Sequence, residues 1–284
     1  AARYIHQHSN RATAPFVTVS CASIQPDQME TVLFGRENAE RGVEKGDRVA
    51  FLALNSTDII DIAFGCWRIG AVCLALNFRL TPHELKFIID NAAAKAVIYD
   101  HMFTPVIDAL KGMELPVEHW IGTDGMGGES EFEQSLAAVD APVLTMEPQT
   151  LDDQCMLMYS SGTTGMPKGV IITHGMIYFG VVAGGNAANG SPDDITLSNM
   201  PLFHIGAFSG TCTPAIFGGG TTAVDRMFDP AKTLEYINDP ELDISTMFMV
   251  PAAYNAIRAL PGAETADFSR IRIALVLIAV IHSS

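Results

Sequence analysis

Positive charge is scarce in this sequence. Its 284 residues include 17 Lys and Arg against 32 Asp and Glu, which gives a formal net charge of −15. A chain with this balance repels nucleic acid and anionic membrane surfaces, so any bound anion must be held by a local feature. We therefore expect no nucleic-acid partner.

Long hydrophobic runs are also missing. The longest uninterrupted run covers residues 273–281, which is too short to span a bilayer, and the first ten residues show no apolar signal segment. Hydrophobic residues nevertheless make up 48% of the chain, which favours a folded protein over a disordered one. The length suits one large domain or two smaller ones, without a transmembrane segment.

Paired cysteines are absent. The five cysteines are odd in number, widely scattered and without a C-x-x-C pair, so they indicate neither a disulfide framework nor a metal knuckle. This usage fits a reducing compartment, and we expect a cytoplasmic protein. The eight histidines are dispersed as well, and we assign no metal ligand.

Short apolar runs alternate with helical periodicity from residue 43 onward, which is typical of βα repeats that build a parallel sheet. Thr81-Pro82-His83-Glu84 has the form of a capping box with proline at the first helical position, which predicts a helix over 82–91 with Leu85, Ile88 and Ile89 facing inward. In the first half we expect further strands over 48–54, 71–76 and 94–100, and a further helix that begins at Thr57. In the second half the same pattern predicts strands over 155–160, 170–173, 195–200, 221–227, 244–250 and 270–281, with helices from Met176, after Gly206 and over 231–238 and 252–260.

A Gly-rich polar stretch over 121–130 and a Pro-bearing stretch over 141–150 interrupt this alternation. We therefore expect an α/β protein of two stacked subdomains with largely parallel sheets. The first subdomain would cover residues 1–150. The second would cover residues 151–284 and be incomplete.

One turn concentrates the groups that bind polyphosphate. Residues 159–169, YSSGTTGMPKG, follow an apolar strand and combine glycines, hydroxyl side chains and one lysine. Glycines allow close backbone approach and free N–H donors, while the hydroxyls and Lys168 supply further donors and a fixed positive charge. The turn is not a Walker A loop, because Pro167 and Gly169 stand where that motif has Gly and Ser or Thr.

The stretch Ser160 to Gly169 resembles the phosphate-loop signature of the adenylate-forming enzymes, (S/T)SGTTGxPKG, specifically that of the AMP-forming acyl-CoA synthetases. Val170 to His174 continue the resemblance as V-x-x-(S/T)-H. The similarity extends to residues 45–56, 70–85, 201–208 and 249–257, and it covers most of residues 41–275.

The resemblance implies that ATP, with Mg²⁺, activates a fatty or aryl carboxylic acid to an acyl-adenylate, which coenzyme A then converts to a thioester. Lys168 and Thr164 would be the catalytic residues, and His204 and Tyr254 would contact the acid. A small carboxylic acid, ATP and coenzyme A are the expected partners, with a homodimer left open. The residues expected to hold the nucleotide are Ser160, Ser161, Gly162, Thr163, Thr164, Gly165 and Lys168.

The resemblance stops after residues 266–275, where the family continues with a Gly-Gly-Ala-Pro turn and this chain reads VLIAVIHSS. Residues 20–40 also depart from the family pattern. The chain thus lacks the adenine and ribose motifs and the C-terminal domain with its lysine, and we expect it to lack parts needed for full turnover.

Two other functions stay open on these grounds. The chain could be a catalytically incompetent remnant that binds phosphate or acyl ligands weakly. It could instead be an amino-acid-adenylating domain, although Gly206, Ala207 and Phe208 follow His204 where such domains place an Asp for the amino group.

Overall fold

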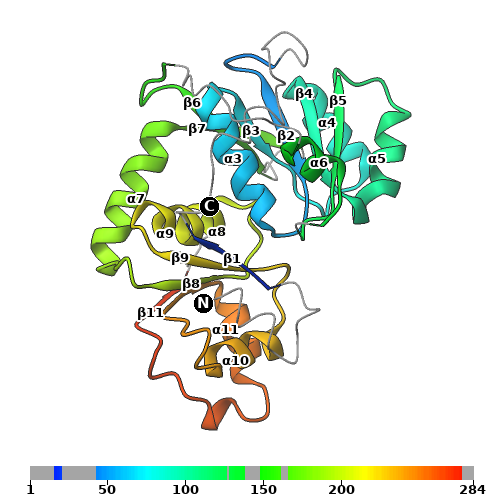
Figure 1. Cartoon of the computed structure of the whole chain (residues 1–284). Coiled ribbons are helices and arrows are strands. Elements are labelled where there is room, and N and C mark those ends of the chain that lie inside the picture. Colours follow the sequence, from blue (N-terminus) through cyan, green and yellow to red (C-terminus); the bar gives the residue numbers. More distant parts are fainter. Residues whose placement is uncertain (1–15, 21–42, 127, 138–147, 161–165, 277–284) are drawn as a thin grey trace, which may run out of the picture. The chain divides into compact units, whose positions relative to one another are not determined.

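The structure is a computed structural model that describes residues 16–20, 43–126, 128–137, 148–160 and 166–276. It is an α/β protein with two sheets whose strands are mostly parallel, as the sequence predicts (Figure 1). Two compact units are present, one made of residues 24–179 and the other of residues 180–284 with the segment up to residue 23. We describe each unit by itself.

The first unit contains a six-stranded sheet in the order β5-β4-β2-β3-β6-β7. All its neighbouring strands are parallel except β6 and β7, which form an antiparallel pair at one edge. The strands are β2 Arg48–Leu52, β3 Val72–Ala75, β4 Ala94–Asp100, β5 His119–Thr123, β6 Gln154–Ser160 and β7 Lys168–Thr173. The expected strands over 48–54, 71–76, 94–100, 155–160 and 170–173 are confirmed, whereas β5 was not expected.

Helices cover both faces of this sheet. The helices of the first unit are α3 Thr57–Ile69, α4 Pro82–Asn91, α5 Thr104–Lys111 and α6 Glu131–Ala137, with a short 3₁₀ turn, η1, at His101–Phe103. The predicted capping box of α4 is present, and Leu85, Ile88 and Ile89 are buried in the core that α4 and α5 share with alternate residues of β2, β3 and β4. Helix α3 packs against β2, β3 and β6.

The second unit contains a five-stranded sheet in the order β1-β9-β8-β10-β11. The strands β8 to β11 are parallel, and β1 pairs with β9 in the antiparallel sense. The strands are β1 Phe16–Ser20, β8 Ile195–Ser198, β9 Thr221–Asp225, β10 Thr246–Met249 and β11 Ile273–Val276. Four of them lie within the predicted ranges, and β1 was not expected.

The helices of this unit follow the strands as the βα pattern predicts. The predicted helix after Gly206 is continuous in space but changes type along its length, because a π-helical turn, η2, interrupts it. The helices are α7 His174–Ala188, α8 Ile205–Ala207, η2 Phe208–Cys212, α9 Thr213–Phe217, α10 Pro230–Asn238, α11 Pro251–Arg258 and the short 3₁₀ turn η3 Ala263–Thr265.

The division between the units falls inside α7, after Phe179. The sequence predicts a boundary between the two subdomains near residue 150. Strands β6 and β7 follow that point but belong to the first sheet, where β6 pairs with β3, so both strands pack with the first unit.

Candidate functional site

The glycine-rich segment of the sequence connects β6 to β7, which are antiparallel neighbours. Ser160 is the last residue of β6 and pairs in register with Lys168, the first residue of β7. Both side chains are exposed, and the Lys168 ammonium makes no hydrogen bond or ion pair with any residue that the structure describes. Ser161, Gly162, Thr163, Thr164 and Gly165, the remaining predicted nucleotide ligands, lie outside the described residues.

An aromatic ring packs against β7 beside the Ser160–Lys168 pair. Tyr159 pairs with Gly169 across the two strands, and its hydroxyl donates to Asn91 Oδ1 at 2.6 Å. A Cβ atom on Gly169 would lie 3.3 Å from Tyr159 Cζ and 3.2 Å from Leu157 Cδ1, which is tighter than an ordinary contact. The absence of a side chain at Gly169 therefore lets the Tyr159 ring lie against β7, and this orients the strand that begins with Lys168.

The two predicted acid-binding residues belong to the second unit. His204 follows β8 and Tyr254 follows β10, and these strands are parallel neighbours. Both residues therefore come after the carboxyl ends of adjacent strands, which is the edge where open α/β sheets bind their ligands.

His204 caps the start of the helix that continues as η2 and α9. Its Nδ1 accepts a hydrogen bond from the Gly206 N–H at 3.1 Å. Because Nδ1 acts as the acceptor, a neutral His204 ring carries its hydrogen on Nε2. The side chain is exposed, so this N–H can donate to an acceptor such as a carboxylate.

Tyr254 lies on α11 and is partly buried. Its hydroxyl donates to the backbone carbonyl of Leu275 on β11 at 2.9 Å, and burial raises its pKa to about 12. The phenol is therefore neutral, and its hydrogen is engaged by the protein. A ligand could use only the ring or the remaining lone pairs of the oxygen.

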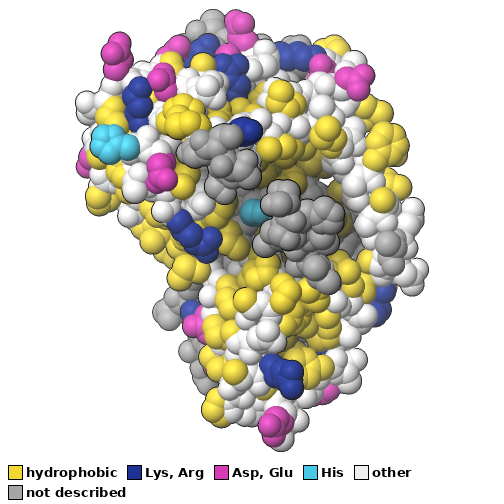
Figure 2. Space-filling model, turned by 180° about the vertical axis from the view of Figure 1, so that it is seen from behind, with side chains coloured by type: hydrophobic (Ala, Val, Ile, Leu, Met, Phe, Trp, Pro, Cys, Tyr) yellow, Lys and Arg dark blue, Asp and Glu magenta, His cyan; other side chains and the backbone are white. Residues whose placement is uncertain are grey.

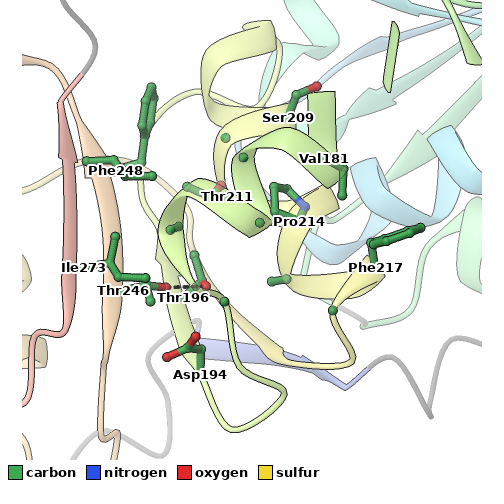
Figure 3. A pocket seen from close by; sticks show the side chains of 18 of the residues that line it. Val181, Asp194, Thr196, Ser209, Thr211, Pro214, Phe217, Thr246, Phe248 and Ile273 are labelled. Carbon is green, nitrogen blue, oxygen red and sulfur yellow. Dashed lines mark hydrogen bonds between the residues drawn. The ribbon is translucent and has the colours of Figure 1, made fainter. Parts of the chain in front are cut away.

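A pocket of about 320 Å³ lies between one face of the second sheet and the helices above it (Figure 3). Residues of β8, β10 and β11 line it on one side, and residues of α7, η2 and α9 line it on the other. Glycines of α7 and η2 widen the pocket, and at η2 the ring of Phe248 lies 3.5 Å from where a Cβ of Gly210 would stand. Its lining includes Asp194, Thr196, Ser209, Thr246, Phe248 and Leu275.

Leu275 links this pocket to the predicted acid site, because its side chain lines the pocket and its carbonyl accepts the hydrogen bond from Tyr254. Sequence reasoning missed the pocket residues, and only Gly206 and the residues after it gave a signal, as a run of small side chains. The structure thus places Ser160 with Lys168 in the first unit and His204 with Tyr254 in the second.

The surface carries charges of both signs. On the face drawn in Figure 2, the coloured Lys and Arg side chains stand as separate spots among acidic and apolar ones. Within the described ranges, no group of three His, Cys, Asp or Glu side chains is arranged to hold a metal ion. Over the same ranges, no helix combines the length and apolar character needed to cross a membrane.

Comparison with known proteins finds the AMP-binding enzyme family over residues 38–284, and a Sigma-54 interaction domain over residues 1–48. A feruloyl-CoA synthase of Amycolatopsis is 35% identical over 232 residues, which are 81% of this chain and 44% of that protein. A long-chain-fatty-acid–CoA ligase of Mycobacterium tuberculosis is 34% identical over 226 residues, covering 78% of this chain and 42% of its own length. The chain thus spans less than half the length of these curated relatives.

Solved structures agree with this assignment. The N-terminal domain of FACL13 from Mycobacterium tuberculosis superposes with a TM-score of 0.79 at 28% identity, covering 89% of this chain and 60% of that one. An anthranilate CoA ligase in complex with anthranoyl-AMP gives a TM-score of 0.78 at 25% identity, covering 89% of this chain and 48% of that one. With a family match over residues 38–284, this chain belongs to the AMP-binding enzyme family.

Proposed function

We propose that this chain carries the acid-activating part of an AMP-forming acid–CoA ligase. The reaction joins a carboxylic acid to the α-phosphate of ATP, releases pyrophosphate and passes the acyl group to the thiol of coenzyme A. The observation that carries the proposal is the segment between β6 and β7, where an exposed lysine with no partner among the described residues begins β7. Only Met166 and Pro167 separate this lysine from a run of glycines and hydroxyl residues in the sequence.

Lys168 has the charge and the position that this reaction needs. Negative charge builds up on the transferring phosphoryl oxygens and on the leaving pyrophosphate, so catalysis depends mainly on positioning and electrostatic stabilisation. Lys168 is the first residue of β7 and pairs with Ser160, the last residue of β6. The neighbouring pair, Tyr159 and Gly169, packs closely and orients β7. Thr164 would add a hydroxyl donor. Mg²⁺ would enter with the triphosphate, and we assign it no protein ligand.

The second unit would bind the acid. His204 Nε2–H would donate to the carboxylate at the carboxyl edge of β8. The apolar pocket next to it would take the carbon skeleton, and Tyr254 would support the wall through Leu275.

A binding protein without turnover is the second candidate. Such a protein would bind nucleotide or acid but would not couple them.

Acid-dependent exchange of labelled pyrophosphate into ATP separates the two candidates. We would measure it with a panel of alkyl and aryl acids, both on this chain and on a form extended by the region that the relatives carry beyond the match. The proposal predicts exchange that requires an acid, and it predicts that His204→Ala changes the ranking of the acids more than the affinity for ATP. No exchange with any acid in the extended form would support the binding protein.

A further inference from the structure

The apolar pocket of the second unit contains a pair of threonines that are not needed to build the sheet. Thr196 on β8 and Thr246 on β10 stand opposite each other in the strand register, and both point to the pocket face. Their Oγ1 atoms are hydrogen-bonded to each other, as the dashed line in Figure 3 shows. The two residues are 9% and 8% exposed, so bulk water has little access to them.

The hydrogen bonds of this pair are incomplete. Two hydroxyl groups carry two hydrogens, and the bond between the Oγ1 atoms uses one of them. The other hydrogen has no acceptor in the part of the chain that the structure describes. Buried polar groups are nearly always hydrogen-bonded, so the spare hydrogen of the threonine pair points to a polar partner inside the pocket.

The surroundings of the threonine pair are otherwise satisfied. Asp194, next along the same face, accepts from Ser245 Oγ at 2.8 Å, from the Ser191 N–H at 2.8 Å and from the guanidinium of Arg272. Its carboxylate therefore has little need of a further donor. On this face of the pocket, the threonine pair is therefore left with a hydrogen that has no acceptor among the described residues.

The position of the pair along the strands gives the ligand a direction. Thr246 is the first residue of β10, and the strand ends at Met249, roughly 10 Å further on at the usual rise per residue. His204 and Tyr254 follow that far edge, while Phe248 and Leu275 line the pocket between the two ends. The pocket thus has an apolar middle, a histidine beyond one end and hydroxyls at the other.

We propose that the pocket selects a carboxylic acid whose apolar body carries a hydroxyl group at the end opposite the carboxylate, and that Thr196 and Thr246 bind this hydroxyl. The inference rests on the proposed function for the carboxylate end only. A hydroxyl can accept the spare hydrogen of the pair and donate in return, whereas a terminal methyl group leaves that hydrogen unpaired. Sites built to bond a substrate hydroxyl reject analogues that lack it.

Binding of four matched ligands to the 284-residue chain tests the proposal. The ligands are para-hydroxyphenylpropionate, phenylpropionate and the primary amides of both, each titrated by calorimetry. We expect the hydroxylated member of each pair to bind about tenfold more tightly, as one additional hydrogen bond implies. Replacing both threonines with valine should abolish this preference, because neither hydroxyl remains, and Thr246→Ser, which keeps the hydroxyl, should retain most of it.

Thr222→Val is the matched control. Thr222 is a buried threonine of β9 in the same sheet, 1% exposed, and it does not line the pocket. This variant should keep the preference for the hydroxylated ligands. Circular dichroism of each variant would verify that it is folded, and if the double valine variant is not, the comparison of hydroxylated and plain ligands on the native chain still decides.

The four ligands separate failure of this inference from failure of the proposed function. Equal affinities for the hydroxylated and plain ligands, a preference that survives when both threonines are replaced with valine, or no binding of any ligand would overturn the inference. Equal affinities would mean that water already satisfies the threonine pair, and a surviving preference would mean that another group binds the ligand hydroxyl. A hydroxyl preference that is the same for acids and amides would support the inference while removing the carboxylate site of the proposed function.

Discussion

Asp61 carries an unusual charge state for a carboxyl group. It lies on α3 in the first unit, and burial, with the nearby charges of Asp58 and Glu133, raises its pKa to about 7. An aspartate in an unfolded chain titrates near ~3.9, so the folded protein holds a proton that the unfolded chain has lost at intermediate pH. This contribution to stability is complete below about pH 4 and is lost as the pH rises through about 7.

Replacing Asp61 with Asn removes this titration. We expect the free energy of unfolding of the native protein to fall by about 2 kcal/mol more than that of Asp61→Asn when the pH rises from about 5 to about 8. Urea denaturation at the two pH values measures the difference. Asp108→Asn, which changes an exposed carboxylate on α5, should follow the native protein. Parallel curves for Asp61→Asn and the native protein would contradict the assignment.

At the scale of single elements, α4 shows how far local signals specify structure. Thr81 Oγ1 accepts from the Glu84 N–H at 3.4 Å, and Glu84 Oε2 accepts from the Thr81 N–H at 2.8 Å. Pro82 adds a backbone angle that suits the first helical turn. Because each of these contacts spans three residues or fewer, the sequence predicts the helix and its bounds.

Removing the cap of α4 should destabilise the first unit. We expect Thr81→Ala to lower the free energy of unfolding by about 1 kcal/mol, since an N–H of the first turn loses its acceptor. Thr81→Ser keeps the hydroxyl and should remain close to the native value. Chemical denaturation of the three proteins tests this, and an equal loss in the Ser and Ala variants would show that the hydroxyl is not what matters.

Elements that depend on distant partners were not predictable in the same way. Strand β1 exists as an edge strand because it pairs with β9, some two hundred positions away, and nothing in its five residues specifies that partner. The π-helical turn η2 departs from the regular helical period, so periodicity predicts a helix there but not its type. Helix α5 was not predicted, although Pro105 suits a first helical turn and Ile107 and Leu110 have the spacing of one buried helix face.

The residues of the candidate site also differ in how far the sequence alone could predict them. The loop at 160–169 is a continuous motif, and the strands on both sides of it were predicted correctly. His204 and Tyr254 could be proposed from local motifs, but their roles as ligand contacts stay predictions. The threonine pair could not be predicted, because Thr196 and Thr246 meet only through the order of β8 and β10 in the sheet.

For the whole molecule, repulsion among the excess acidic residues should lower the stability of the folded state. A net charge of −15 produces self-repulsion, which salt screens as the Debye length falls from about 30 Å at about 0.01 M to about 10 Å at about 0.1 M. We therefore expect the thermal midpoint to rise over this range of NaCl. Surface ion pairs such as Lys45–Asp153 and Lys95–Asp47 act in the opposite direction, and a falling midpoint would mean that such pairs dominate.

The central claim for the whole molecule is that the segment ending at Lys168 binds the phosphates of a nucleotide. Calorimetric titration of the chain with Mg-ATP tests it most directly, using Lys168→Ala and, as a control, Lys86→Ala, which removes another lysine of the same unit from its surface ion pair with Asp90. Loss of one charge-assisted contact predicts that Lys168→Ala binds Mg-ATP at least about tenfold more weakly, while Lys86→Ala binds as the native chain does. Equal affinities of Lys168→Ala and the native chain, or no binding by the native chain, would contradict the account.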